Sequence, residues 1–261
     1  MMTPLLKVEH LKAGYGRKVI LKDVSFEVAP GEIRVILGGS GCGKSTLLNN
    51  ILQLEKPLSG NISFFGESYP ATVPIPDEVR KRTGVLFQGG ALLTSLTVAE
   101  NVALPLQRHK PGIPKSVMDD VIADRLEKVH LLHAFNKYPS ELSGGMRKRA
   151  ALARALALEP ELLFCDEPSA GLDPITARSL DELLLELRDD LKISVVIVTH
   201  ELESIKTICD KFIFLKEGYV LLDGTLQQGL ESDIPDIRTF FRRECPAEFG
   251  GTDFVKFEVE D

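Results

Sequence analysis

Cysteine is scarce in this sequence of 261 residues, with four in total. Cys42, Cys165, Cys209 and Cys245 lie far apart, and no two of them have the spacing of zinc ligands. The scarcity therefore argues against a disulfide framework and against a cysteine-based metal site, and it fits a protein of the reducing cytosol.

A surplus of basic charge is also missing, because 31 Lys and Arg oppose 38 Asp and Glu and the formal net charge is −7. A general nucleic-acid binder needs a basic face that displaces counterions, so no nucleic-acid partner is expected. Two short basic runs, 80–82 and 147–149, are interpreted as solvated faces of helices or loops.

Long hydrophobic runs are absent as well. The longest surrounds Val195–Val198 and falls far short of the roughly 20 residues that span a bilayer. The first residues, MMTPLLKVEH, lack the basic and apolar regions of a signal peptide. We therefore expect a chain that is neither secreted nor membrane-spanning by itself.

The balance of 44% hydrophobic and 26% charged residues is ordinary for a folded protein with a substantial core. Short β-rich runs predict strands between residues 5 and 38, and helical spacing of apolar residues begins at Lys44. Helices at 117–129 and 143–157 would form a helical insert. Strands at 162–165, 195–199 and 212–215, separated by helices such as 177–191, then predict an α/β fold with a mainly parallel sheet.

Residues 38–45, Gly-Gly-Ser-Gly-Cys-Gly-Lys-Ser, match the phosphate-loop pattern G-x-x-x-x-G-K-S between a predicted strand and a predicted helix. The glycines let backbone N–H groups converge on phosphate oxygens, and the helix N-terminus adds the positive end of its dipole. Lys44 would neutralise phosphate charge and Ser45 would ligate Mg²⁺. The expected ATP-binding residues here are Gly38, Gly39, Ser40, Gly41, Cys42, Gly43, Lys44, Ser45 and Thr46.

The apolar run 162–165 ends in two carboxylates, Asp166 and Glu167. In open α/β sheets, ligands bind at the carboxyl edge where such a strand ends. Asp166 would hold Mg²⁺ through water, while Glu167 would polarise the attacking water as a general base. Alone this pattern is weak, because strand ends often carry exposed carboxylates.

The segment Leu142-Ser143-Gly144-Gly145-Met146 begins a predicted helix ahead of that strand. A serine and two small residues at a helix N-terminus can cradle an anion. With this segment the chain resembles ATP-binding cassette (ABC) ATPases, whose signature LSGGQ lies between the phosphate loop and the Asp-Glu pair. Met146 stands where glutamine is usual, so a polar side-chain contact is lost while the backbone and Ser143 keep the cradle.

Further residues match the family in its order, to about residue 225. The resemblance implies that Tyr15 stacks on adenine, that Gln88 senses Mg²⁺ and couples to a membrane partner, and that His200 contacts the γ-phosphate. The loop 169–173, with Asp173, resembles the one that contacts the opposite subunit. The expected catalytic residues are thus Glu167 and His200, and the expected Mg²⁺ ligands are Ser45, Gln88 and Asp166.

The resemblance also implies a RecA-like, mainly parallel sheet core with an N-terminal antiparallel β subdomain and an inserted α-helical subdomain. We expect a nucleotide-binding domain over 5–243, with the helical subdomain at about 89–160, and a C-terminal tail over 244–261 that either finds a strand partner or frays. Two copies would form a homodimer, head to tail, with each ATP between one copy's phosphate loop and the other's signature. A separate permease would complete the transporter.

The segment 86–102, LFQGGALLTSLTVAENV, carries no charge before Glu100. In ABC ATPases this region forms the groove that receives a permease helix, so we expect protein contact here, with part of the segment packed inside the helical insert. Together with SELSGGMRKRAALARALALEPELLFCDEP and GLDPIT, it resembles the ATPase subunits of mammalian-cell-entry (MCE) or Mla-type systems, which move phospholipids between bacterial membranes.

That resemblance implies a peripheral ATPase at the cytoplasmic face of the inner membrane, with a permease, an MCE-domain substrate-binding protein and, in Mla systems, a small STAS-type subunit as partners. One alternative is an ABC ATPase for another cargo, such as amino acids or lipoproteins. A soluble ABC protein acting on DNA or ribosomes usually has two cassettes or a long coiled-coil insertion, and neither is seen here. A nucleotide-binding scaffold without activity is disfavoured by the presence of Glu167 and His200.

Overall fold

The computed structural model describes residues 3–242, so the predicted tail 244–261 lies outside the described residues. The strands are β1 (Leu6–Tyr15), β2 (Lys18–Val28), β3 (Ile33–Gly38), β4 (Ser59–Phe64), β5 (Glu67–Pro70), β6 (Thr83–Leu86), β7 (Leu162–Asp166), β8 (Ser194–Val198), β9 (Lys211–Lys216) and β10 (Tyr219–Thr225). The α-helices are α1 (Lys44–Ile51), α2 (Asp77–Lys81), α3 (Val98–His109), α4 (Lys115–Lys128), α5 (Gly144–Ala155), α6 (Pro174–Leu191), α7 (Leu202–Ile208), α8 (Leu226–Leu230) and α9 (Pro235–Arg242), with 3-10 turns η1 (Leu132–Ala134) and η2 (Pro139–Glu141).

The described strands form one sheet in the order β5-β4-β1-β2-β10-β9-β3-β8-β7-β6. Strands β9, β3, β8, β7 and β6 pair in parallel, whereas β2, β1, β4 and β5 pair antiparallel. A parallel pairing of β10 with β2 joins the two parts. The predicted RecA-like parallel core with an N-terminal antiparallel β subdomain is therefore confirmed.

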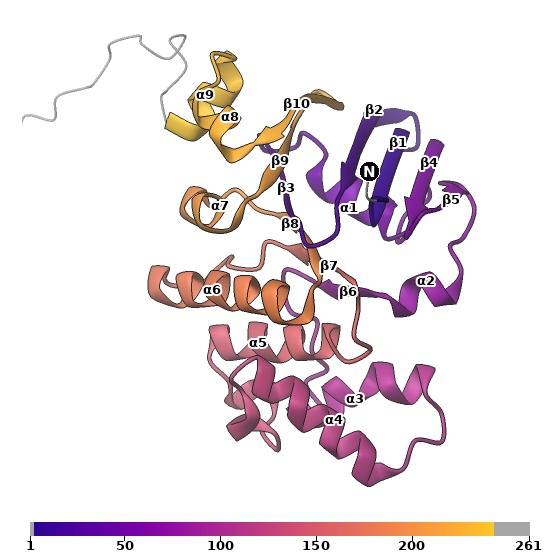
Figure 1. Cartoon of the computed structure of the whole chain (residues 1–261), viewed down its shortest axis with the longest axis vertical. Helices are drawn as coiled ribbons and strands as arrows, with labels where there is room; N and C mark the ends of the chain where they lie inside the picture. The colour runs from indigo at the N-terminus through magenta and orange to yellow at the C-terminus, as the bar shows by residue number, and fades with distance from the viewer. Residues whose placement is uncertain (1–2, 243–261) are drawn as a thin grey trace, which may run out of the picture.

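The central strands are buried on both faces, which is why they appear in the sequence as mostly apolar runs, interrupted on β3 by Arg34. On β3, Val35 and Leu37 belong to one hydrophobic cluster, and Ile36 between them belongs to the other. Helices α6 and α7 pack into the first cluster, while α1 packs into the second through Leu47 and its neighbours. Figure 1 shows this layering, with α1 on the opposite side of the central strands from α6 and α7.

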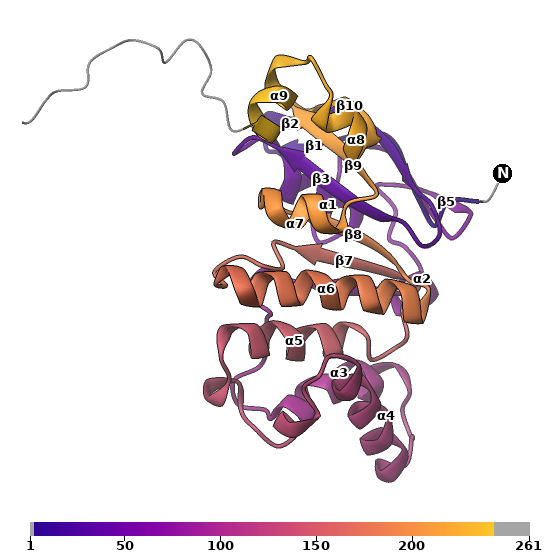
Figure 2. The ribbon, with the colours of Figure 1, turned by 60° about the vertical axis from the view of Figure 1, so that its left-hand side comes forward.

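Three helices, α3, α4 and α5, lie together beyond α6, away from the antiparallel strands (Figures 1 and 2). Their apolar faces share one cluster with the adjacent face of the sheet. The sequence predicted α4 and α5 but not α3. Helix α3 has Thr97 as its N-cap, in a capping box with Glu100, and contains Pro105 within it.

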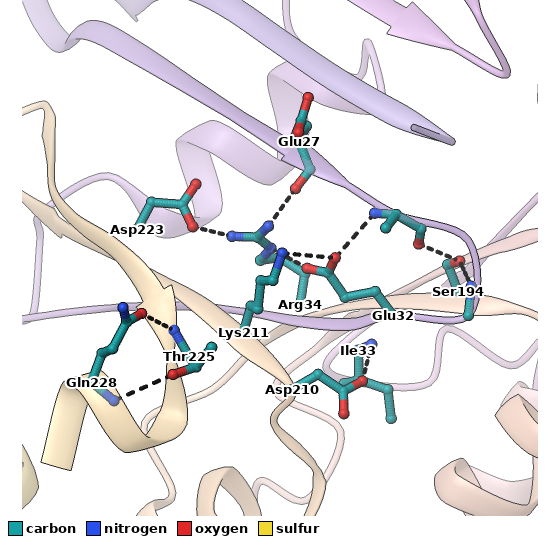
Figure 3. Close-up of polar contacts among 12 residues, drawn as sticks. Glu27, Glu32, Ile33, Arg34, Ser194, Asp210, Lys211, Asp223, Thr225 and Gln228 are labelled. Carbon is teal, nitrogen blue, oxygen red and sulfur yellow. Dashed lines mark hydrogen bonds and ion pairs between the residues drawn. The ribbon is translucent and has the colours of Figure 1, made fainter. Parts of the chain in front are cut away.

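A buried ionic group fixes the β9–β10 hairpin to the amino end of β3 (Figure 3). Arg34 is 2% exposed, and its guanidinium donates to Glu32 Oε1 at 2.6 Å, to Glu27 O at 2.6 Å and to the carboxylate of Asp223 on β10. A buried cation must be paired, so Arg34 specifies where β10 joins the core.

Among residues 3–242, none of the helices combines the length and the apolar character that a membrane span requires.

Candidate active site

The loop between β3 and α1 has a backbone that demands glycine at two positions. Gly38 has φ +146°, and a Cβ there would lie 2.5 Å from Leu215 O on β9. Gly43 has φ +110°, and its Cβ would lie 2.7 Å from Leu21 Cδ2. These contacts hold the loop tightly against the sheet, so the chain turns directly from β3 into α1.

The N-terminus of α1 opens outward from this loop. Within the described residues no side chain caps α1, and its N-cap is Gly43. A Cβ at Gly39 or at Gly41 would meet no atom within 4 Å. Lys44 Nζ donates to Gly38 O at 2.9 Å and to Gly39 O at 3.1 Å, so its ammonium lies over the loop. A glycine-rich loop with an ammonium over it, at an uncapped helix N-terminus, suits a phosphate group.

Ser45 is exposed in the first turn of α1, whereas Thr46 is buried. The half-buried Cys42 packs under the loop, and burial raises the pKa of its thiol despite the opposing charge of Lys44. Cys42 therefore acts here as a small neutral packing residue.

Tyr15, at the end of β1, lies beside the same helix. Its hydroxyl donates to Glu55 Oε2 at 2.6 Å and lies 3.4 Å from Thr46 Oγ1. The hydrogen bond to Glu55 raises the pKa of Tyr15. With half of its surface exposed, the ring offers an anchored aromatic face next to the phosphate loop.

The two carboxylates lie on strands next to the loop. Asp166 on β7 and Ile36 on β3 both pair with Val198 of β8, so all three strands end at one edge of the sheet. Burial raises the pKa of Asp166, the neighbouring Glu167 carboxylate adds to the rise, and Lys148 opposes it. A cation bound at this edge would favour the ionised form of Asp166 and so oppose the effects of burial and of Glu167 on its pKa.

Glu167 is held in an unusual backbone conformation, with φ +45° in the left-handed region. Its N–H donates to Val198 O at 2.8 Å, and its Oε1 lies 2.8 Å from His200 Nδ1. Its other oxygen, Oε2, is buried and has no hydrogen-bond partner among the described residues. A non-glycine residue is kept in this conformation only by surrounding contacts, and the orphaned oxygen is suited to a water molecule or another small polar group.

One basic run does not behave as expected. Lys148 was interpreted as part of a solvated face, but its side chain is 6% exposed. Its Nζ donates to Glu167 O at 3.2 Å and also to Gln88 O. Burial lowers the pKa of Lys148, while the acidic edge nearby opposes that shift. The missed signal was helical spacing: position 148 shares a face with Ala151 and Leu152, both fully buried.

The segment after Gln88 is an ordered surface loop. Gln88 itself is exposed, as are Gly89 and Ala91. Arg154 of α5 donates to Gly90 O at 2.7 Å and to Ala91 O at 2.6 Å. The loop is therefore fastened to α5 through backbone carbonyls.

The second half of that loop is fastened to α3. Buried Asn101 accepts from Leu93 N at 2.8 Å and donates to the carbonyls of Leu93, Leu96 and Thr97 at 2.9 to 3.2 Å. Leu93 is nevertheless 49% exposed. An apolar side chain is thus presented on a rigid backbone.

The segment 142–146 forms the start of α5. Ser143 is the N-cap, and its side chain accepts from Met146 N at 3.3 Å. A Cβ at Gly145 would lie 2.5 Å from Thr176 Cγ2 of α6, and one at Gly144 would lie 3.3 Å from Leu172 Cδ2. The two glycines therefore also let the beginnings of α5 and α6 meet.

Asp173 caps α6, accepting from Ile175 N at 3.1 Å and Thr176 N at 3.0 Å. Its other oxygen accepts from the Thr176 hydroxyl at 2.5 Å, and this hydrogen bond lowers the pKa of Asp173. The segment 142–146 and Asp173 thus form one surface. In both Figures 1 and 2, helices α5 and α6 are separate from α1.

The donor set at the sheet edge fits Mg²⁺. Ser45 and Asp166 supply hydroxyl and carboxylate oxygens, the ligands that Mg²⁺ prefers, and Gln88 supplies an amide oxygen. Within residues 3–242 no cluster of three or more His, Cys, Asp or Glu could hold a metal alone. A Mg²⁺ ion that shares phosphate oxygens with the protein needs only one or two carboxylates.

A phosphate loop at the carboxyl edge of a parallel sheet is the nucleotide site of P-loop ATPases, and fold and site assign the chain to that class. The family model described as "ABC transporter" matches residues 21–170. The chain belongs to this family and is an ABC ATPase, which binds ATP with Mg²⁺ and hydrolyses it.

Two curated relatives and one solved structure show the range of similarity. The chain is 36% identical over 257 residues to the intermembrane phospholipid transport system ATP-binding protein MlaF of Haemophilus influenzae, covering 97% of each chain. It is 40% identical over 215 residues to the methionine import ATP-binding protein MetN 1 of Bacillus cereus, covering 82% of this chain and 61% of that protein. It is similar, with a TM-score of 0.74 and 31% identity over 85% of this chain and 98% of the other, to a post-hydrolysis ATP-binding cassette dimer bound to ADP and phosphate.

Proposed function

We propose that the chain is the ATPase subunit of an MCE- or Mla-type transporter that moves phospholipid between the inner and outer membranes of a bacterium. The observation that carries this proposal is the similarity to MlaF, because 36% identity extends over 97% of both chains. The MetN 1 relative is covered over 61% of its length. The cargo of MetN 1 is therefore a weaker guide to the cargo of this chain than the cargo of MlaF is.

The proposed catalytic roles follow from the site. Lys44 and the N–H groups of the loop 38–46 would bind the phosphates, and Tyr15 would stack on the adenine. Ser45, Gln88 and Asp166 would hold Mg²⁺, whose positive charge would stabilise the negative charge of the phosphate oxygens. Glu167 would orient and deprotonate water at its unpartnered Oε2, while His200 fixes Oε1.

The proposed assembly is a head-to-tail homodimer in which residues 142–146 and Asp173 complete the partner's site. These residues lie at the beginnings of α5 and α6, and both helices are separate from α1, which follows the phosphate loop of the same chain (Figures 1 and 2). Beside them Ile175 is 83% exposed, which is unusual for an isoleucine. A dimer interface at this position would bury its side chain. The similar post-hydrolysis structure is a dimer.

Two features support a separate permease as partner. The loop 88–97 presents Leu93 on a backbone that Arg154 and Asn101 hold in place. A rigid, uncharged loop loses little conformational freedom when a protein helix binds. Residues 89–160 would then act as the permease-facing helical subdomain of a nucleotide-binding domain over 5–243, at the cytoplasmic face of the inner membrane.

The proposal is tested by affinity purification of the tagged chain from detergent-solubilised membranes at native expression, with identification of the proteins recovered. Recovery of an MCE-domain protein and a permease, with or without a STAS-type subunit or contacts through the tail 244–261, would support phospholipid transport. Recovery of a different permease would favour the second candidate, an ATPase for another cargo, which the 40% identity to MetN 1 motivates. Recovery of nucleic acid or ribosomes without a permease would contradict both.

A further inference from the structure

We infer that Lys148 is a positioning residue that makes the placement of Glu167 depend on the loop 88–91, so that contact at the permease-facing surface is transmitted to the hydrolytic site. The inference deepens the proposed function and rests on its assignment of Glu167 and of the loop. Its starting point is a single buried ammonium that donates to two backbone carbonyls, Gln88 O and Glu167 O.

Glu167 is held by contacts from several elements. Its left-handed backbone must be stabilised in this way, and four hydrogen bonds to Glu167 are seen, one of them from Ala170 N to its carbonyl at 3.2 Å. Val198 of β8 accepts from the N–H of Glu167. His200, in the loop after β8, contacts the Glu167 side chain. Lys148, which donates to the Glu167 carbonyl, comes from α5. Of these four bonds, one therefore links Glu167 to the helical part of the chain.

The loop 88–91 is held by α5. Helix α5 donates to three of its carbonyls, through Lys148 at Gln88 and through Arg154 at Gly90 and Ala91. Loop and helix should therefore move together when a partner presses on the exposed loop. Lys148 differs from Arg154 because it also reaches Glu167, and a shift of α5 relative to β7 would change that bond directly.

The same helix begins at Ser143, whose segment is proposed to complete the partner's site. Helix α5 would thus have the segment 142–146 at its N-terminus. Along its side it would bind the loop 88–91, and through Lys148 it would bind the carbonyl of Glu167. A chain of packed, hydrogen-bonded groups of this kind can carry coupling between sites.

The experiment compares two substitutions on α5 in the full-length protein. Lys148→Met fills similar space without N–H donors. It removes the hydrogen bonds from α5 to Gln88 O and Glu167 O, while Ala170 N still donates to Glu167 O. Arg154→Met frees the loop alone and is the matched control. For each, kcat and KM for ATP, binding of a fluorescent ATP analogue, the melting temperature and hydrogen–deuterium exchange of residues 86–93 and 164–170 are measured.

For Lys148→Met we expect kcat to fall at least about tenfold, because small misplacements of reacting groups cost up to about 100-fold, with KM and analogue binding within about twofold. Exchange should rise in both segments. Arg154→Met should raise exchange in 86–93 only, and Lys148→Arg, which keeps donors at the position, should recover most of kcat.

A Lys148→Met protein with unchanged kcat, or with faster exchange in one segment only, would overturn the inference. A loss of melting temperature together with a loss of analogue binding, unrescued by Lys148→Arg, would also overturn it by showing a purely structural role. Glu167→Gln is measured alongside: if it retains the wild-type rate, the proposed role of Glu167 has failed, which is a separate result.

Discussion

Asp181 is a buried acid whose ionisation should cost stability. It lies on α6, is 3% exposed, and accepts from the Ser204 hydroxyl of α7 at 2.6 Å, while its Oδ1 has no partner among the described residues. Burial raises the pKa of Asp181 from 3.8 to about 6; the hydrogen bond from Ser204 opposes this, and Glu182 and Glu201 add to it.

The sign follows from the direction of the shift. A carboxyl whose pKa is raised by folding stabilises the native state fully below its unfolded value, and that contribution is lost as pH rises to its native value. At about 1.4 kcal/mol per pH unit of difference in pKa, the rise to about 6 corresponds to about 3 kcal/mol, lost between about pH 4 and pH 6.

Asp181→Asn removes this dependence. Its amide leaves donors without a partner, which adds a constant cost of about 1–3 kcal/mol, so the informative quantity is the pH trend. Relative to the wild type, the free energy of unfolding of the variant should rise by about 1.4 kcal/mol between pH 5 and pH 7.5, the part of the total that falls in this range.

The assay is urea unfolding followed by circular dichroism at several pH values. Asp190→Asn, on the exposed side of the same helix, controls for the loss of one carboxylate. A difference between Asp181→Asn and wild type that is flat with pH, or that shrinks as pH rises, would refute the reasoning.

Three further substitutions test the site. Lys44→Ala removes the cation over the phosphate loop, so ATP turnover should fall about 100-fold or more with little change in melting temperature; unchanged turnover would rule out the phosphate-loop assignment. Gly145→Ala should destabilise the protein by about 1–3 kcal/mol and reduce ATPase activity, because its Cβ would lie 2.5 Å from Thr176 Cγ2. Adding Thr176→Ser, which lacks that methyl, should restore both, and failure to do so would show another cause. Replacing Leu92 and Leu93 by Asp should abolish recovery of the permease with little loss of ATP binding, whereas a complex that still assembles would exclude docking at the loop. Leu58→Asp, at another exposed leucine, is the control.

The parallel core was predictable because both faces of its strands are buried. Strands β3, β7 and β8 are mostly apolar in sequence, and the residues that end them, Gly38 and Asp166 among them, mark the edge where ligands bind. The segment 142–146, between the phosphate loop and the two acids, then carried the resemblance to the family.

Helix α3 was missed although its buried residues are apolar except for Asn101. Asn101 faces the core, where it bonds the loop before the helix, and Pro105 stands inside the helix. Both residues argue locally against a helix, and packing overrides them. The capping box of Thr97 and Glu100 was the available signal.

The burial of Lys148 could not be predicted from composition. In sequence it lies between Arg147 and Arg149, where a run of charge indicates solvent. Its environment depends on carbonyls contributed by residues 88 and 167, which are remote along the chain. Such long-range pairing becomes visible only in the folded chain.

The proposed function requires a composite site in which Glu167 promotes hydrolysis of ATP bound between two copies. Its most direct test is the molar mass of Glu167→Gln, measured by light scattering with Mg²⁺ and ATP, together with its ATPase rate. We expect a stable dimer that retains ATP, and we expect this dimer to dissociate when Ser143→Arg is added. A monomer with ATP bound, or hydrolysis at the wild-type rate, would contradict the composite site.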